Sequence, residues 1–141
     1  MIKSGFIVTL LLLTSLSCQR KFISTLSTEK VRMWMVTNLD GFSKDQLIHN
    51  QAYIDLSTST RQKAFAGCNQ ISFTAKERNG NEILFSDIVT TLKACPGNEA
   101  METQLNKVLN QARSILVEGH QMSLFDQQGK LLLKAIAADW D

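Results

Sequence analysis

Short segments in which apolar and polar residues alternate restrict the fold of this chain more than any other feature, and they recur from position 31 onward. Alternation with a period of two is typical of strands that bury one face. Turn signals separate these segments, and Asn79-Gly80 is the strongest because both residues tolerate a positive φ angle. The predicted strands are 32–37, 52–56, 64–66, 71–75, 82–85, 88–93, 115–117, 122–125 and 131–133. The polar run 57–62 is the expected connection of a hairpin.

One segment breaks this alternation and predicts the main helix. After Pro96-Gly97, five apolar residues recur at helical spacing and share one face: Met101, Leu105, Val108, Leu109 and Ala112. Asn98 suits the N-cap position, and Glu99 and Glu102 complement the positive end of the helix dipole. A shorter helical turn capped by Ser43 is also expected.

These elements together indicate the fold class. A helix with one apolar stripe and several two-faced strands bury each other when the helix packs on a concave sheet. We therefore expect an α+β domain, in which a curved antiparallel sheet packs against one main α-helix over about residues 98–112. The alternative is a fully closed barrel with the helix plugging one end.

The N-terminal stretch has the features of an export signal. Lys3 provides a positive start, and the apolar residues 6–13 are too few to cross a membrane as a mature helix. The small residues Ser15 and Ser17 precede Cys18, a pattern that resembles a bacterial lipoprotein cleavage site. We expect Cys18 to become the acylated N-terminus, because two or three acyl chains hold a protein stably to one leaflet. The alternative is an ordinary signal peptide that ends at Cys18.

The chain divides accordingly into three parts. Residues 1–17 are the expected signal peptide, residues 18–30 the lipidated N-terminus and polar tether, and residues 31–137 one domain. The formal charge of +2 becomes 2 − 1 = +1 when Lys3 is removed, so charge indicates no particular partner. The expected location is the bacterial cell envelope, with the lipid anchor in the outer membrane.

Two cysteines remain if Cys18 carries lipid. Cys68 and Cys95 are then the two thiols of an exported domain, so a structural disulfide is the leading expectation. Two separate buried thiols, or a reversible redox pair, are the alternatives. Closing the loop between them would stabilise the fold by about 3 to 4 kcal/mol.

Two short motifs around these cysteines resemble a known family. One is Gly67-Cys68-Asn69, and the other is the segment from Thr90 to Cys95, which ends just before the predicted helix. Their order and spacing over about 31–135 are similar to META domains of the HslJ type. The resemblance assigns the family motif to Gly67, Cys68, Asn69, Thr91, Cys95 and Glu99. It implies an envelope lipoprotein associated with heat or antibiotic stress, with no agreed reaction or ligand.

Other chemistry has little support in the residues. A thiolate nucleophile needs a nearby base or cation, and the histidines, His49 and His120, lie in predicted polar loops that sequence does not bring to Cys68. The cysteines and histidines lack the close-spaced pairs of zinc sites. Phosphate loops and basic stripes with aromatics are absent, so no nucleic acid and no cofactor are expected.

The sequence thus predicts a non-catalytic envelope lipoprotein. Its partners would be the membrane, through the lipid anchor, and an unidentified protein, peptide or small apolar ligand. The alternative is a redox or thiol-dependent enzyme that uses Cys68 and Cys95.

Overall fold

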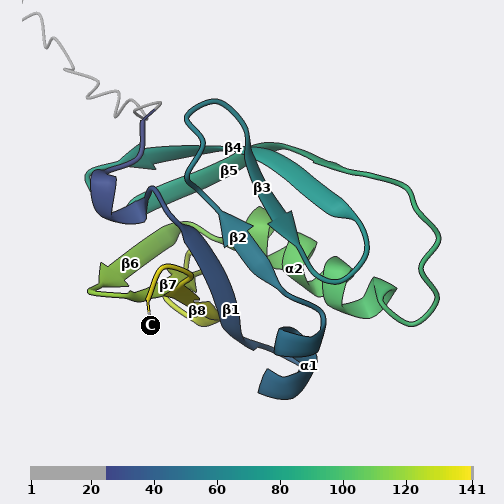
Figure 1. The fold of residues 1–141 in the computed structure, drawn as a ribbon. Coiled ribbons are helices and arrows are strands. Elements are labelled where there is room, and N and C mark those ends of the chain that lie inside the picture. Colours follow the sequence, from purple (N-terminus) through teal and green to yellow (C-terminus); the bar gives the residue numbers. More distant parts are fainter. Residues whose placement is uncertain (1–24, 141) are drawn as a thin grey trace, which may run out of the picture.

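Eight antiparallel strands close into a barrel in which each strand pairs with its neighbours in chain order (Figure 1). The structure is a computed structural model, and it describes residues 25–140. The elements are η1 (Thr28–Lys30), β1 (Met33–Leu39), α1 (Lys44–His49), β2 (Tyr53–Asp55), β3 (Gln62–Phe65), β4 (Gln70–Arg78), β5 (Glu82–Thr90), α2 (Glu99–Gln111), β6 (Ser114–Glu118), β7 (Gln121–Phe125) and β8 (Leu131–Ala137). The α+β class is confirmed, and the sheet takes the closed form.

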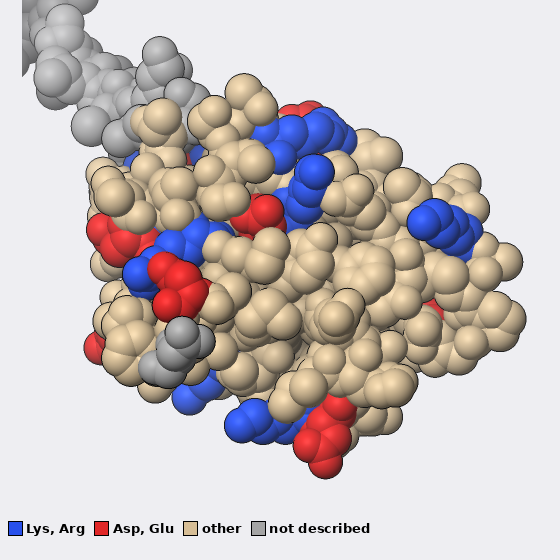
Figure 2. Space-filling model, in the orientation of Figure 1, with Lys and Arg blue, Asp and Glu red and all other residues tan. Residues whose placement is uncertain are grey.

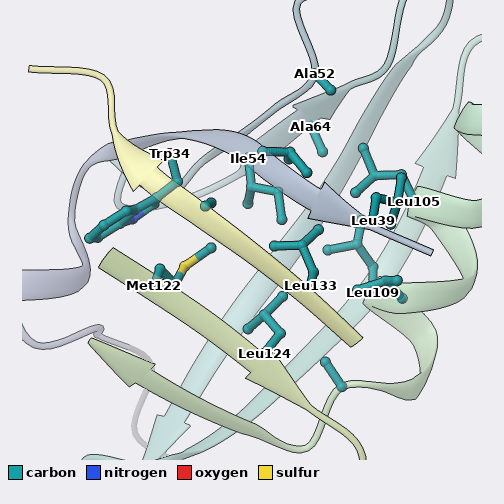
Figure 3. Close-up of a cluster of buried hydrophobic side chains, with 14 of the residues drawn as sticks. Trp34, Leu39, Ala52, Ile54, Ala64, Leu105, Leu109, Met122, Leu124 and Leu133 are labelled. Carbon is teal, nitrogen blue, oxygen red and sulfur yellow. The ribbon is translucent and has the colours of Figure 1, made fainter. Parts of the chain in front are cut away.

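The alternation seen in the sequence becomes the division between the inside and the outside of the barrel. Along β4, every second residue from Ile71 to Glu77 is buried. The inward side chains of all strands join those of α2 in one apolar core, part of which is drawn in Figure 3. Trp34 and Phe73 are the largest fully buried side chains. Half-buried Tyr53 instead lies on the outer face, stacked on Phe65 with ring centroids 5.9 Å apart.

The connections between strands give the barrel two different ends. At the end that we call the helical end, α1 links β1 to β2 and α2 links β5 to β6. The capping box between Ser43 and Gln46 confirms the predicted start of α1. The buried face of α2 carries Met101, Leu105, Val108 and Leu109, and it closes this end.

The opposite end, which we call the entry end, is where β1 begins and β8 ends. Glu77 occupies an inward position there and accepts a hydrogen bond from the Lys30 ammonium group at 3.1 Å, and both side chains are almost fully buried. Ser27 donates its backbone N–H to the same carboxylate at 2.7 Å. The Trp34 indole donates to the Lys30 carbonyl at 3.0 Å. Residues 27–30, which the sequence assigns to the tether, are therefore part of the barrel's closure.

Three local features differ from the sequence expectations. β5 is one strand from Glu82 to Thr90, where the sequence predicts two strands separated by residues 86 and 87. A bulge lies at this position, at Asp87, whose φ angle is +54°. Residues 91–95, partly predicted as strand, have no regular structure. Gln62, expected in a polar loop, is buried in β3, where its side-chain oxygen accepts the Ala75 N–H at 2.9 Å.

The outer face of β1, β2 and β3 carries few charges at its centre. In Figure 2, acidic and basic side chains gather mainly around this area and interleave at its left, where the entry end lies. Met35 and Ile136 continue the half-buried outer surface beside Tyr53, since Met35 pairs with both. Within residues 25–140, none of the helices is long and apolar enough to span a bilayer.

Candidate functional site

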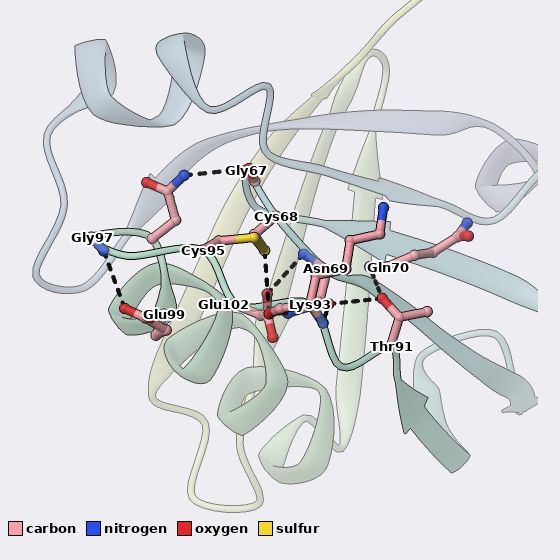
Figure 4. The surroundings of a disulfide bond; sticks show 11 residues. Gly67, Cys68, Asn69, Gln70, Thr91, Lys93, Cys95, Gly97, Glu99 and Glu102 are labelled. Atoms are coloured by element: carbon pink, nitrogen blue, oxygen red, sulfur yellow. Dashed lines mark hydrogen bonds between the residues drawn. A yellow bond between two sulfur atoms is a disulfide. The ribbon is translucent and has the colours of Figure 1, made fainter.

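A disulfide at the helical end joins the turn between β3 and β4 to the segment that precedes α2 (Figure 4). It links Cys68 and Cys95, whose Cα atoms are 6.0 Å apart, across a sequence separation of 27. Cys68 is 9% exposed, so the bridge is shielded on one side. The pairing expected from the sequence is confirmed, and neither thiol is free.

Gly67 allows the turn to approach α1 closely. Its φ angle is +99°, a conformation that other residues adopt only with strain. A Cβ atom at this position would lie 2.5 Å from the Asn50 side-chain oxygen. The Gly67 carbonyl also accepts a hydrogen bond from the Asn98 side chain at 3.4 Å. Asn98 thus uses its side chain to hold the turn, and its predicted side-chain cap of α2 is absent.

Asn69 fastens the irregular segment to the barrel. Its side-chain oxygen accepts hydrogen bonds from the Lys93 N–H at 2.7 Å and the Thr91 hydroxyl at 2.9 Å. Its amide group donates to the Lys93 carbonyl at 3.1 Å. The Thr91 hydroxyl in turn accepts the Gln70 N–H at 3.1 Å. Because Asn69 is only 6% exposed, these bonds are largely shielded from water. We call the set of hydrogen bonds that joins Asn69 to Thr91 and Lys93 the Asn69 bracket.

Two carboxylates from the first turn of α2 accept backbone N–H groups near the disulfide. Glu102 accepts the Asn69 backbone N–H at 2.9 Å, and Glu99 accepts the Gly97 N–H at 3.2 Å. The sequence indicated Glu99 through the family resemblance and Glu102 only as a partner of the helix dipole. The sequence signal for Glu102 is its position next to the apolar stripe, because such a side chain lies at the border of the buried face.

One apolar side chain next to the Asn69 bracket is fully exposed to solvent. Leu92 lies between the fastened residues Thr91 and Lys93, and it is 98% exposed. A groove of about 600 Å³ runs beside it, between residues 90–94 and α2. Lys93 and Lys107 are exposed along this groove, and Glu102 is half-buried. The arrangement is a hydrogen-bonded loop at the edge of the groove, with one exposed apolar side chain and two neighbouring cations.

The two histidines lie at opposite ends of the barrel. His49 is in the last turn of α1, and His120 is in the turn between β6 and β7 at the entry end. Among residues 25–140, no three His, Cys, Asp or Glu side chains gather as a metal ion would require. Cys18 lies outside the described residues.

The comparisons with known proteins agree with the fold and with the family that the sequence resembles. The model of the META domain family matches residues 26–139. A solved NMR structure of a protein from Burkholderia xenovorans is 23% identical, with a TM-score of 0.54, and the match covers 76% of this chain and 82% of that one. This likeness concerns the fold alone. No curated protein matches the chain. Since the family match spans nearly the whole described structure, the chain belongs to the META domain family.

Proposed function

We propose that this protein is a non-catalytic, stress-associated lipoprotein of the bacterial outer membrane, and that it binds another protein through Leu92 and the adjoining groove. The observation that carries the proposal is the exposure of Leu92 on a segment that a disulfide and the Asn69 bracket hold in place. Because the backbone on both sides of Leu92 is already fastened, binding through this side chain needs little further ordering of the chain, which favours its use as a contact.

The surroundings of Leu92 indicate the chemistry of the partner. Burying a leucine side chain contributes about 1.5 to 3 kcal/mol, enough for an anchor residue. Lys93 and Lys107 carry exposed positive charges beside it, while Glu102 is engaged with Asn69. The partner surface that fits is an apolar pocket bordered by carboxylates.

Two further observations support the envelope lipoprotein assignment. A disulfide between Cys68 and Cys95 suits an oxidising compartment outside the cytosol. The residues before Cys18 have the charge, apolar length and small residues of a lipoprotein signal. The lipid at Cys18 would keep the domain at the membrane, where its partner is also expected.

Photo-crosslinking in intact cells tests the binding surface. A photoreactive residue at position 92 should give a defined protein adduct, and Lys93→Glu should reduce its yield because the partner is acidic. The matched control is position 48, since Ile48 is 61% exposed on α1 at the same end of the barrel. Equal adducts at both positions, or none at 92, would show that Leu92 is not a contact.

Labelling with a palmitate analogue tests the anchor. The intact chain should take up label and Cys18→Ala should not, so label retained by the variant would exclude acylation at Cys18. Mass spectrometry of protein from the envelope tests the non-catalytic assignment. A fully oxidised bridge that resists mild reductant is expected, whereas a mixed population of thiols and disulfide would favour the redox alternative.

A further inference from the structure

Both ends of the described chain leave the barrel at the entry end (Figure 1). Arg32, just before β1, forms an ion pair with Asp139 at 3.2 Å, and the Ala138 N–H donates to the Met33 carbonyl at 2.9 Å. The start of β1 and the residues after β8 therefore form one surface. The family motif and Leu92 lie at the opposite, helical end.

Exposed apolar side chains gather on this surface. Trp140 is 53% exposed, Val31 39% and Met33 38%. Val31 and Met33 line a hollow of about 360 Å³ together with Ala138. The Trp140 ring stacks on His120 with centroids 3.6 Å apart, so it is held against the barrel rather than extended freely.

The length of chain before the barrel limits which end can face a membrane. Ser27 is bonded to Glu77, so eight residues, 19–26, separate Cys18 from the fastened chain. They span at most about 28 Å, and a flexible chain of that length spans about 14 to 17 Å. The nine-residue strand β4, tilted as in other barrels, makes the barrel about 23 Å tall. A lipid at Cys18 would therefore keep the entry end near the bilayer.

Several charges at this end are paired. On the surface, Arg32 pairs with Asp139 and Arg78 with Glu82, while Lys30 pairs with Glu77 inside and with the exposed Glu29. Interleaved red and blue side chains are visible at this end in Figure 2. Contact with lipid would then depend on the apolar and aromatic side chains. Tryptophan is enriched at membrane interfaces because its ring is apolar and its N–H is polar.

We propose that the entry end rests on the phospholipid surface that holds the anchor, with Trp140, Met33 and Val31 at the boundary between lipid and water. This orientation rests on the proposed lipid at Cys18. It points the family motif and Leu92 away from the membrane, toward the partner. The contact is weakly dependent on salt, because paired charges attract anionic lipid little.

Tryptophan fluorescence of the full lipidated chain in vesicles tests this orientation. The vesicles contain phosphatidylethanolamine and phosphatidylglycerol, with or without bromine on the acyl chains. The chain has two tryptophans, and Trp34 is fully buried in the core. Brominated lipid should quench the intact protein about twofold more than Trp140→Phe, whose emission comes from Trp34. The effect should persist at high salt.

A matched probe at the other end is Leu92→Trp in the Trp140→Phe background. This probe should show no quenching beyond that of Trp34. Flotation with the vesicles reports the anchor separately. Protein that floats but leaves Trp140 unquenched, or in which the probe at position 92 is quenched equally, would overturn the orientation while the anchor stands. Protein that does not float would overturn the anchor and the orientation together.

Discussion

Removing the disulfide between Cys68 and Cys95 should destabilise the domain chiefly by freeing the unfolded chain. With a sequence separation of 27, the loop-entropy relation gives about 12 cal/mol/K, or about 3.5 kcal/mol at 25 °C. That is a large share of the 5 to 15 kcal/mol typical of small domains. The described chain has 140 − 25 + 1 = 116 residues, for which the unfolding entropy is about 0.24 kcal/mol/K, so the melting temperature should fall by about 14 °C.

The folded state should change little, because the same segment has other attachments. Asn69 still binds Lys93 and Thr91, and Glu102 still accepts the Asn69 N–H. Cys68→Ser, Cys95→Ser and the double variant should therefore lose nearly the same free energy of unfolding, since each opens the same loop.

Thermal and urea unfolding, followed by circular dichroism, measure these losses. The urea m-value should rise in all three variants because the unfolded chain expands when the loop opens. Reduced wild-type protein is the matched control and should resemble the double variant. A double variant that loses about twice as much as each single variant would refute the reasoning. A loss below about 1 kcal/mol in all of them would do so too, because the loop would then constrain nothing.

Three further predictions concern the two ends and the outer face. Lys30→Met and Glu77→Leu should each cost about 3 to 5 kcal/mol in urea unfolding, because each removes the buried partner of the other charge. Among the described residues, Lys30 then keeps only Glu29 as a charged partner, and Glu77 keeps only the hydrogen bonds from Ser27. The double variant should come close to wild type, and a double variant with the summed loss would contradict this. Gly67→Ala should cost about 2 kcal/mol or more, since it places a Cβ at φ +99° against Asn50, and adding Asn50→Ala should recover part of the loss; no recovery would show that the contact is unimportant. Burial, followed by the charge of Asp55, raises the pKa of Tyr53. Because the folded-state pKa lies above the unfolded value of about 10, ionisation of Tyr53 lowers the free energy of unfolding as the pH rises through the folded pKa. Tyr53→Phe lacks this group and should lose less stability than wild type between about pH 9 and 11. Equal losses would contradict the raised pKa of Tyr53.

Local patterns predicted most of the elements. The helical spacing from Met101 to Ala112 located α2 to within one residue at each end, because an apolar stripe is a property of neighbouring residues. The alternation located the strands but not their lengths. β5 extends through Asp87, whose positive φ angle the alternation does not show. Ser43 was identified as a cap because the capping bond joins residues three apart.

The candidate site was predicted in part. The cysteine pair followed from counting thiols, and the family resemblance indicated Asn69 and Thr91. The roles of these residues did not follow, because the bonds from Asn69 cross 22 to 24 residues to Thr91 and Lys93. Nothing in the local pattern singled out Leu92, because its exposure depends on how the segment is fastened.

The sequence by itself determined which residues alternate and where the main helix lies, and it predicted that Cys68 pairs with Cys95, since these are matters of local order and composition. The tertiary structure alone decided that the sheet closes, that Lys30 and Glu77 seal one end, and that Leu92 stands out at the other. The physical reason is distance along the chain. The Lys30–Glu77 contact joins residues 47 positions apart, and only the closed barrel removes both charges from water together.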